Sequence, residues 1–269
     1  MQRFLTHVTA AACVFAAGTA NAMSTAVDLS AWTAESYPAV SGFSPGEWDV
    51  ASDNKSVTQT TNGQPTLFYS DFNAHGTAVT GQIEVSGTDD DFIGFLLGYQ
   101  PDDINNTAAD YLMIDWKARD QSFNFGAPSS TPGSTAEEGL AASRVSGIPT
   151  ADEFWGHTDF TENSDGGVEE LARGMTLGST GWMRNTVYEF VFDFGPGNLQ
   201  VYVDDMLEFD LSGDFENGRL AFYNFSQAGV TYSGFESEEG SFTPVPAPTT
   251  AVLLIAGLLG LLAGRRLTD

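Results

Sequence analysis

The chain has 269 residues, of which 36 are acidic and 10 are basic, so its formal net charge is −26. Hydrophobic residues make up 42% of the sequence and aromatic residues 12%, which is enough apolar material for a folded core and argues against a disordered acidic protein. Because a nucleic-acid-binding surface needs clustered Lys and Arg, this composition also argues against nucleic acid as a partner and favours cations.

The first 22 residues have the organisation of a secretory signal peptide. Arg3 supplies the positive start, an apolar stretch follows over residues 8–17, and residues 20–22 (Ala-Asn-Ala) form a small-x-small cleavage site. The single cysteine of the sequence, Cys13, lies inside this segment. We therefore predict an exported chain whose mature form contains no thiol and no disulfide.

Strand patterns dominate residues 23–243, which we interpret as one domain. Apolar and polar residues alternate in some segments, as in half-buried strands, and apolar residues run continuously in others, as in strands covered on both faces. The predicted strands are 79–85, 92–99, 111–117, 187–194, 199–203, 220–225 and 230–235, with short helices near 137–145 and 168–173 and a flexible insertion over 127–139. Many short strands joined by Gly and Asp turns predict an all-β antiparallel sandwich or jelly roll.

Three adjacent carboxylates, Asp89, Asp90 and Asp91, lie between two predicted strands, and we call them the Asp triplet. Adjacent carboxylates repel one another, and solvation, protonation or a bound cation relieves that cost. Side chains alternate in an extended chain, so two of the three share a side and can ligate one Ca²⁺. A second loop would supply further oxygen ligands, and Asp71 and Asn73 are candidates for it. The residues alone leave open the alternative of a solvated acidic loop.

Residues 161–166 and the two histidines of the mature chain also contain side-chain types that can bind metals. Residues 161–166 resemble the start of an Asp-rich calcium loop, but Thr161 stands in place of Asp and Ala172 in place of the final Glu, so we predict a turn. The mature chain keeps His75 and His157, which are too far apart in sequence to make a zinc site by themselves. We predict a structural role for His157.

Catalytic motifs are weak in this sequence. It contains no Gly-x-Ser-x-Gly elbow, and the mature chain keeps no cysteine for thiol chemistry. Residues 47–52 begin like the Glu-x-Asp-x-x-Glu motif of sandwich-fold glycoside hydrolases, but Ser52 replaces the second carboxylate of the acid and nucleophile pair. We predict a non-catalytic protein, with a secreted glycan hydrolase of concanavalin-like fold as the alternative.

The end of the chain combines proline-spaced residues, an apolar run and two arginines. Residues 245–248 read Val-Pro-Ala-Pro, residues 251–263 are apolar almost without interruption, and Arg265 and Arg266 follow. A helix over residues 249–264 would be about 24 Å long, somewhat shorter than the hydrocarbon core of roughly 30 Å. The arginine pair fits retention on the cytoplasmic side of a membrane.

This segment, residues 244–269, resembles the PEP-CTERM sorting tail of Gram-negative exported proteins, with Ala247 where that family usually carries Glu. The resemblance implies a transmembrane helix, recognition by an exosortase-type processing enzyme, and release or attachment at the cell surface.

Two blocks of residues carry a second resemblance. They comprise Gly46–Trp48, Ser56–Thr60, Ser70–Asn73, Gly81–Val85, Thr88–Gln100, Tyr111–Lys117, Phe154–Thr158, Gly181–Trp182 and Gly218–Gln227. Over about residues 46–235 the chain is similar, in order, to the C-terminal lectin-like domain of the thrombospondins. The resemblance implies a concanavalin-like sandwich with calcium ions at one end, and it favours metal ligation by the Asp triplet. The insertion over residues 118–136 is unlike the family, so partner surfaces of animal thrombospondins do not transfer.

These observations predict an exported, non-catalytic, calcium-binding adhesion module that is sorted to the cell surface or to an exopolysaccharide matrix. Residues 23–243 carry seven basic and 35 acidic side chains, a net charge of −28, and a thiol-free domain of this charge gains stability when divalent ions neutralise its carboxylates. An extracellular polysaccharide or a surface protein would be its ligand. A passive structural component of a surface layer or biofilm is a further alternative.

Overall fold

The computed structural model describes residues 24–40, 42–161 and 163–239. The predicted signal peptide and the sorting tail with its helix lie outside the described residues. Within the described residues, no helix has both the length and the apolar character needed to cross a membrane.

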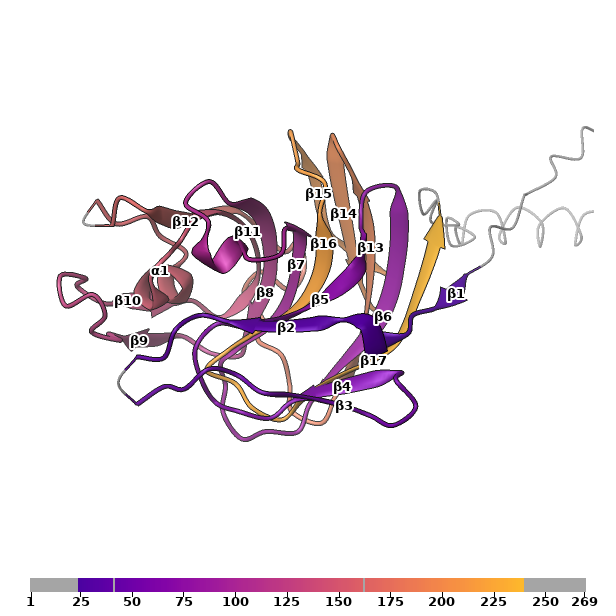
Figure 1. Cartoon of the computed structure of the whole chain (residues 1–269), viewed down its shortest axis with the longest axis horizontal. Coiled ribbons are helices and arrows are strands. Elements are labelled where there is room, and N and C mark those ends of the chain that lie inside the picture. Colours follow the sequence, from indigo (N-terminus) through magenta and orange to yellow (C-terminus); the bar gives the residue numbers. More distant parts are fainter. Residues whose placement is uncertain (1–23, 41, 162, 240–269) are drawn as a thin grey trace, which may run out of the picture.

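Two antiparallel sheets stack face to face and confirm the predicted all-β sandwich (Figure 1). Sheet 1 runs in the order β15 (Met206–Ser212), β14 (Asn198–Val203), β13 (Val187–Gly195), β6 (Thr77–Val85), β17 (Val230–Glu239), β4 (Ser56–Gln59) and β3 (Trp48–Val50), and β1 (Thr25–Ala26) pairs with β17. Sheet 2 runs in the order β12 (Gly166–Arg173), β11 (Gly139–Gly147), β8 (Asp110–Lys117), β7 (Phe92–Tyr99), β16 (Arg219–Phe225), β5 (Thr66–Asn73) and β2 (Thr33–Ser36). Two short 3₁₀ helices, η1 (Leu29–Ala31) and η2 (Asp103–Asn105), lie in the connections.

Aromatic rings from the two sheets meet in the core between them. Phe95 of sheet 2 lies 5.1 Å from Phe190 and 4.6 Å from Phe192 of sheet 1, measured between ring centroids. The alternation predicted for residues 187–194 puts these two phenylalanines on the same inward face of β13. Burying a ring of this size removes about 150–250 Å² from water, so these contacts dominate the stability of the sandwich.

A second core lies on the outer face of sheet 2. It is covered by α1 (Ala151–Gly156), by the hairpin of β9 (Gln121–Phe123) and β10 (Ser134–Ala136), and by the segment that carries Tyr37 and Phe43. Thr150 caps α1, because its hydroxyl accepts from the backbone N–H of Glu153, whose carboxylate accepts from the N–H of Thr150. The inner strands of sheet 2, such as β7 and β8, are therefore buried on both faces.

Two predictions of helix were wrong, one because of this double burial and the other because β12 carries a bulge at Leu171, between the residues that pair with Ala142 and Ser143. The segments near 137–145 and 168–173, predicted as helices, belong to strands β11 and β12. Leu140 and Ala142 face the core between the sheets, whereas Val145 faces the second core. An apolar run without alternation was therefore the mark of a strand buried on both faces. Part of the insertion predicted to be flexible pairs instead as β10 with β9.

Strand register places the connecting loops at two poles. Loops 59–65, 86–91 and 226–229 meet at what we call the triplet pole, where Gly87 N–H donates to the carbonyl of Gly229. At the opposite end of the sandwich, which we call the terminal pole, β1 pairs with the end of β17. The end of β17 also pairs with the start of β6. The two described ends of the chain therefore lie side by side (Figure 1), at the start of β6, whereas the triplet follows the other end of this strand.

Candidate metal site

The Asp triplet lies where β6 leads into β7, at the triplet pole. One carboxylate oxygen from each of Asp89, Asp90 and Asp91 lies within 4.8 Å of the others. Asp89 is exposed, the side chain of Asp90 is 37% exposed, and that of Asp91 is 3% exposed. In the described ranges, this is the one group of three or more His, Cys, Asp or Glu whose ligand atoms come so close.

Lys117, at the end of β8, donates to the buried side of the triplet. Its fully buried Nζ lies 2.7 Å from Oδ1 of Asp91, 3.2 Å from Oδ1 of Asp90 and 2.8 Å from the Asp90 carbonyl oxygen. The ammonium also lies 5.1 Å from the ring centroid of Trp155 and donates to Oε1 of Gln121 on β9. Sequence reasoning missed this ion pair, for which the only available signal was a lysine closing a strand that is otherwise apolar on both faces.

One lysine does not balance three carboxylates. Burial raises the pKa of Asp91 to about 6, against the opposing effect of the Lys117 ammonium, and the charge of Asp89 raises it further. The backbone of Asp91 is held rigidly, since its N–H donates to Oε1 of Gln227 at 3.0 Å and its carbonyl accepts from Nε1 of Trp182 at 3.0 Å. The site therefore holds the buried carboxylate of Asp91 in a fixed position, and the triplet as a whole keeps a net negative charge beside Lys117.

A second loop approaches the triplet, but a different one from that expected. Nδ2 of Asn62 donates to Oδ2 of Asp89, and Oδ1 of Asn62 accepts from the hydroxyl of Ser226 at 3.2 Å. Loops 59–65 and 226–229 thus bring amide and hydroxyl groups, those of Asn62, Ser226 and Gln227, next to the triplet. These are the ligand types that Ca²⁺ takes besides carboxylates.

Asp71 and Asn73 lie at the far end of the sandwich. Through β16, the register aligns Thr66 of β5 with Ile93 of β7, and Asn73 with Tyr99. At about 3.3 Å per residue, this separates Asp71 from the triplet by roughly 20 Å. The expectation that these two exposed side chains complete the ion's shell at the triplet is therefore corrected. The direction of β5 relative to β7 depends on the sheet order, which local sequence does not reveal.

A network of charged side chains, buried at His157 and Asp115, lies beside the triplet pole on the outer face of sheet 2. His157 ends α1 in the left-handed conformation, with φ 46°, and this aims its ring between two carboxylates. Nε2 of His157 lies 3.0 Å from Oδ2 of Asp115, and Nδ1 lies 3.2 Å from Oε2 of Glu170. Arg173 extends the network, because it pairs with Glu170 at 2.9 Å and with Glu137 at 3.1 Å.

The two carboxylates set the protonation of His157. Burial alone lowers the pKa of this imidazole, but Asp115 and Glu170 outweigh it and raise the pKa to about 9. Burial raises the pKa of Glu170, yet contact with His157 and Arg173 leaves it below its usual value. His75 packs separately on Phe194 with 4.5 Å between ring centroids, so the two histidines do not share a site.

Residues 47–52, which begin like a glycoside hydrolase motif, lie at an edge of sheet 1. Glu47 and Asp49 flank Trp48 at strand β3 and are both exposed, whereas Trp48 turns inward onto Phe68 with 5.7 Å between ring centroids. These two carboxylates therefore stand on the surface at the rim of sheet 1.

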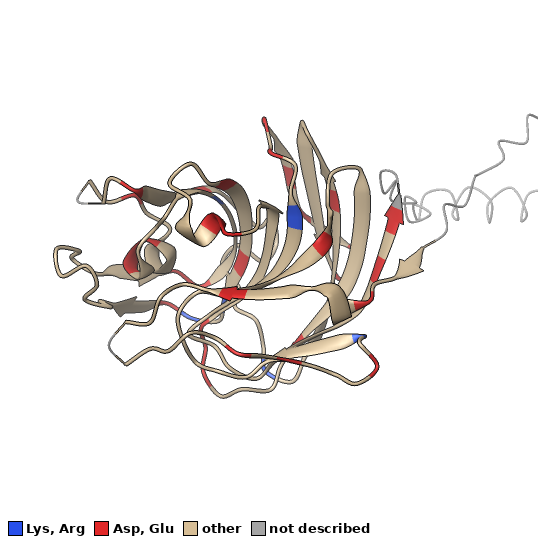
Figure 2. Ribbon diagram, in the orientation of Figure 1, with Lys and Arg blue, Asp and Glu red and all other residues tan. Residues whose placement is uncertain are grey.

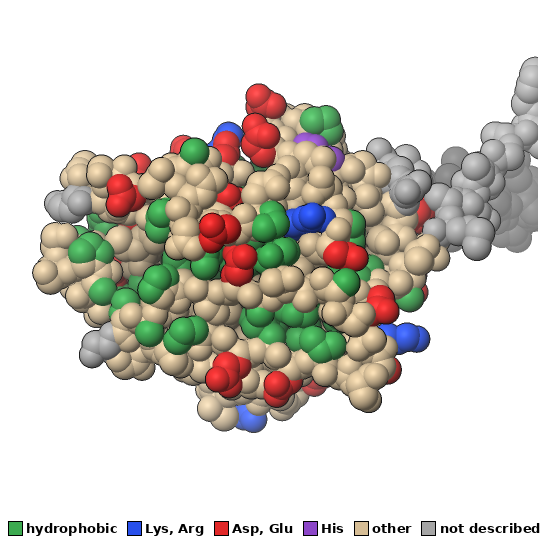
Figure 3. Space-filling view, in the orientation of Figure 1, with side chains coloured by type: hydrophobic (Ala, Val, Ile, Leu, Met, Phe, Trp, Pro, Cys, Tyr) green, Lys and Arg blue, Asp and Glu red, His purple; other side chains and the backbone are tan. Residues whose placement is uncertain are grey.

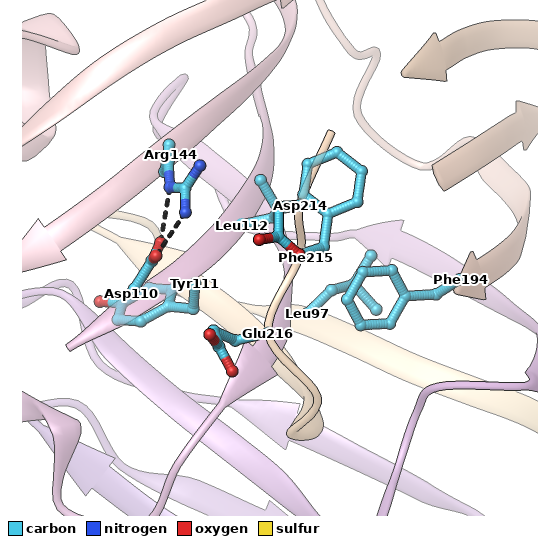
Figure 4. A pocket seen from close by; sticks show the side chains of 9 residues that line it. All are labelled: Leu97, Asp110, Tyr111, Leu112, Arg144, Phe194, Asp214, Phe215 and Glu216. Atoms are coloured by element: carbon cyan, nitrogen blue, oxygen red, sulfur yellow. Dashed lines mark hydrogen bonds and ion pairs between the residues drawn. The ribbon is translucent and has the colours of Figure 1, made fainter. Parts of the chain in front are cut away.

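A small cavity lies near the terminal pole. It has room for about one water, 10 Å³, between Phe215, Leu97 and Phe194, and Arg144 faces Asp110 across its rim (Figure 4). The guanidinium holds Asp110 through two hydrogen bonds, one of them 2.7 Å long.

Acidic side chains outnumber basic ones over both sheets and on the face drawn in Figure 3 (Figures 2 and 3).

Comparison with known proteins gives the following relatives. The family model described as "Thrombospondin C-terminal region" matches residues 44–238. Thrombospondin-3b of Danio rerio is 26% identical over 198 residues, which are 69% of this chain and 20% of that protein, so the chain spans about a fifth of this relative's length.

Solved structures give likenesses at low identity. Carbohydrate binding module CBM66 from Bacillus subtilis is 11% identical, with a TM-score of 0.47 over 77% of this chain and 94% of that one. The exoplasmic/lumenal domain of VIP36, in its Ca²⁺/Man3GlcNAc-bound form, is also 11% identical, with a TM-score of 0.47 over 80% of this chain and 86% of that one.

Proposed function

Because this chain belongs to the thrombospondin C-terminal family, we propose that it is an exported, non-catalytic binding module whose sandwich is stabilised by calcium at Asp89, Asp90 and Asp91. The observation that carries this proposal is the convergence of three carboxylates within 4.8 Å at one pole, with a single buried lysine to oppose them. Ca²⁺ takes six to eight oxygen ligands, and loops 59–65 and 226–229 bring further oxygens to the same place.

Lys117 and a calcium ion can share the triplet. The lysine contacts Oδ1 of Asp90 and Oδ1 of Asp91 from the buried side, and each carboxylate has a second oxygen. An ion bound from the solvent side would relieve the burial cost that raises the pKa of Asp91. In a domain of net charge −28, such an ion also reduces repulsion among the remaining carboxylates.

The positions of the chain ends support display on a surface. The N-terminal strand β1 and the end of β17 lie together at the terminal pole. A sorting tail that follows β17 would hold this pole toward the cell envelope and leave the triplet pole facing outward. An extracellular polysaccharide or a surface protein could then reach it, and this supports a role in adhesion.

Calcium titration calorimetry on the full chain tests the proposal. We expect heat of binding for the unmodified protein and a strong loss of affinity in Asp89→Asn and Asp90→Asn, which keep side-chain size but remove charge. Asp205→Asn is the matched control, because Asp205 is exposed in a positive-φ turn that Asn tolerates. Absence of binding heat in the unmodified protein would refute calcium stabilisation at this site.

A further inference from the structure

We propose that a groove along the β9–β10 hairpin binds a neutral, hydroxyl-rich glycan chain. This inference rests on the proposed function of an extracellular binding module and gives it a ligand site. Two adjoining depressions, of about 220 and 390 Å³, meet at Thr135, and together we call them the hairpin groove. The residues that line it are Ser122, Phe123, Asn124, Pro132, Gly133 and Ser134 on one side, and Glu137, Trp155, Gly156, His157, Glu170 and Arg173 on the other.

Phe123 provides an aromatic platform at one end of the groove. Phe123 is 39% exposed, whereas every other phenylalanine that the structure describes is buried or half-buried. Edge contacts with Phe43, at 5.6 Å, and Phe125, at 4.7 Å, hold the ring in place. An exposed, immobilised aromatic face suits the apolar C–H face of a sugar ring, because burying both surfaces removes apolar area from water without ordering a flexible side chain.

The rest of the groove presents preorganised hydrogen-bonding groups. The hydroxyls of Ser122 and Thr135 lie 2.7 Å apart across the hairpin ladder. Farther along, Arg173 pairs with Glu137 and Glu170, so the groove wall carries both donors and acceptors. Gly156 lets α1 approach β10 closely, since a Cβ there would lie 2.5 Å from Cβ of Ser134. A chain of hydroxyl groups, each both donor and acceptor, matches such a surface.

Charge selects a neutral ligand over an anionic one. The two cationic groups of the groove, Arg173 and His157, already pair with carboxylates of Glu137, Glu170 and Asp115. These three acids and two bases leave the local balance negative, in a domain whose own net charge is strongly negative. A polyuronate or sulfated chain would therefore be repelled, whereas uncharged hydroxyls are not.

The two broad faces of the sandwich are less suitable for a glycan. The outer face of sheet 2 is covered by α1, the hairpin and the segment that carries Tyr37. The outer face of sheet 1 carries Glu84, Glu189 and Asp210 between polar neighbours. The hairpin groove has both an exposed ring and hydroxyl groups among its lining residues.

Contacts through Gln121 couple the groove to the triplet. Its side-chain oxygen accepts from Lys117 at 3.1 Å, and its carbonyl accepts from Nε1 of Trp155 at 2.9 Å. Lys117 in turn pairs with Asp91. The strand that carries Ser122 and Phe123 is thus positioned by the same lysine that pairs with Asp90 and Asp91 of the triplet.

The test uses the full chain on an array that carries neutral glucans, mannans and galactans together with polyuronates. We expect binding to neutral chains, and a loss of apparent affinity of about ten-fold or more in Phe123→Ala and in Thr135→Val. Thr135→Val keeps the shape of the side chain and removes only the hydroxyl, so it tests the groove even where loss of the Phe123 ring loosens the hairpin. Met206→Ala is the control, because Met206 is an exposed apolar residue of similar accessibility, 54%, on edge strand β15.

The possible outcomes test the glycan site in the hairpin groove and the proposed calcium-stabilised module separately. If neutral glycans still bind after both substitutions, the proposal that they bind in the hairpin groove is wrong. Binding to polyuronates alone, or to no glycan, overturns it as well. In each of these cases, calcium titration of the same sample decides independently whether the calcium-stabilised module stands.

Discussion

Lys117 and Asp91 form a buried ion pair, with Nζ 2.7 Å from Oδ1 and side chains that are 0% and 3% exposed. A buried pair of this kind is weak evidence for stability in itself, but removing one partner leaves an uncompensated charge. The pair also ties three parts of the molecule together, because the same ammonium contacts Asp90, Gln121 and the face of Trp155.

Lys117→Met should destabilise the fold by about 3–5 kcal/mol in the presence of chelator, since Asp91 then lies buried without its partner. Added calcium should recover part of this loss, because the ion supplies positive charge to the same carboxylates. Urea unfolding with chelator and with calcium measures both values. Lys55→Met, at the edge of sheet 1, serves as the surface control. An equal loss under both conditions would contradict sharing of the triplet by lysine and ion.

Calcium should raise the unfolding midpoint of the unmodified chain, and Asp89→Asn should abolish most of that rise. Ligand binding to the folded state alone stabilises it by about 2.7 kcal/mol when the free ion is at one hundred times its dissociation constant. Thermal unfolding at increasing calcium concentration measures the effect. Asp205→Asn should respond to calcium as the unmodified chain does. A midpoint that is indifferent to chelator would refute the prediction.

Stability should fall on the alkaline side through loss of the His157 proton. The pKa of His157 is raised to about 9 in the fold, above the value near 6.5 of an unfolded histidine. The stabilisation by protonated His157 is therefore fully present below about pH 6.5 and is lost as pH rises through about 9. It amounts to about 3 kcal/mol.

Urea unfolding in chelator at pH 6, 7.5 and 9.5 measures this slope, and His157→Gln should flatten it. His75→Gln is the matched control, because burial lowers the pKa of His75 and its charge contributes little to the fold. An alkaline slope that persists in His157→Gln would assign the effect to another group.

The exported protein should lack both ends of the encoded chain. Cleavage after residue 22 removes the signal peptide, and processing at the sorting tail removes the apolar segment over 249–264. Intact mass spectrometry of the form recovered from outside the cell gives both ends at once. A product that still carries residues 253–262 would exclude processing of the tail, and a product that starts at Met1 would exclude the signal peptide.

Much of the fold could be predicted because strand signals are local. The alternation in residues 187–194 puts Phe190 and Phe192 on one face, and the structure buries them against Phe95. The same local argument was wrong for residues 137–145 and 168–173. Strand β11 is covered on two sides by α1, the hairpin and the opposite sheet, so its apolar residues do not alternate. In β12, a bulge at Leu171 interrupts the alternation.

Much less of the candidate site could be predicted. The adjacency of Asp89, Asp90 and Asp91 is written in the sequence, and so is their position between two strands. Asp71 and Asn73, by contrast, were assigned to the wrong end of the sandwich, because β5 and β7 are separated by β16 and point the same way. The network at His157 was also invisible, since it joins side chains from α1, β8 and β12.

The sequence by itself determined that this is a strongly acidic, thiol-free domain of many short strands with three contiguous carboxylates, because composition, periodicity and adjacency are properties of neighbouring residues. Only the tertiary structure decided which loops surround those carboxylates, that Lys117 lies beneath them, and that the β9–β10 hairpin forms a groove beside them. Such contacts join residues distant in the chain. They depend on sheet order and register, which are fixed by the summed packing of both cores and by no single segment.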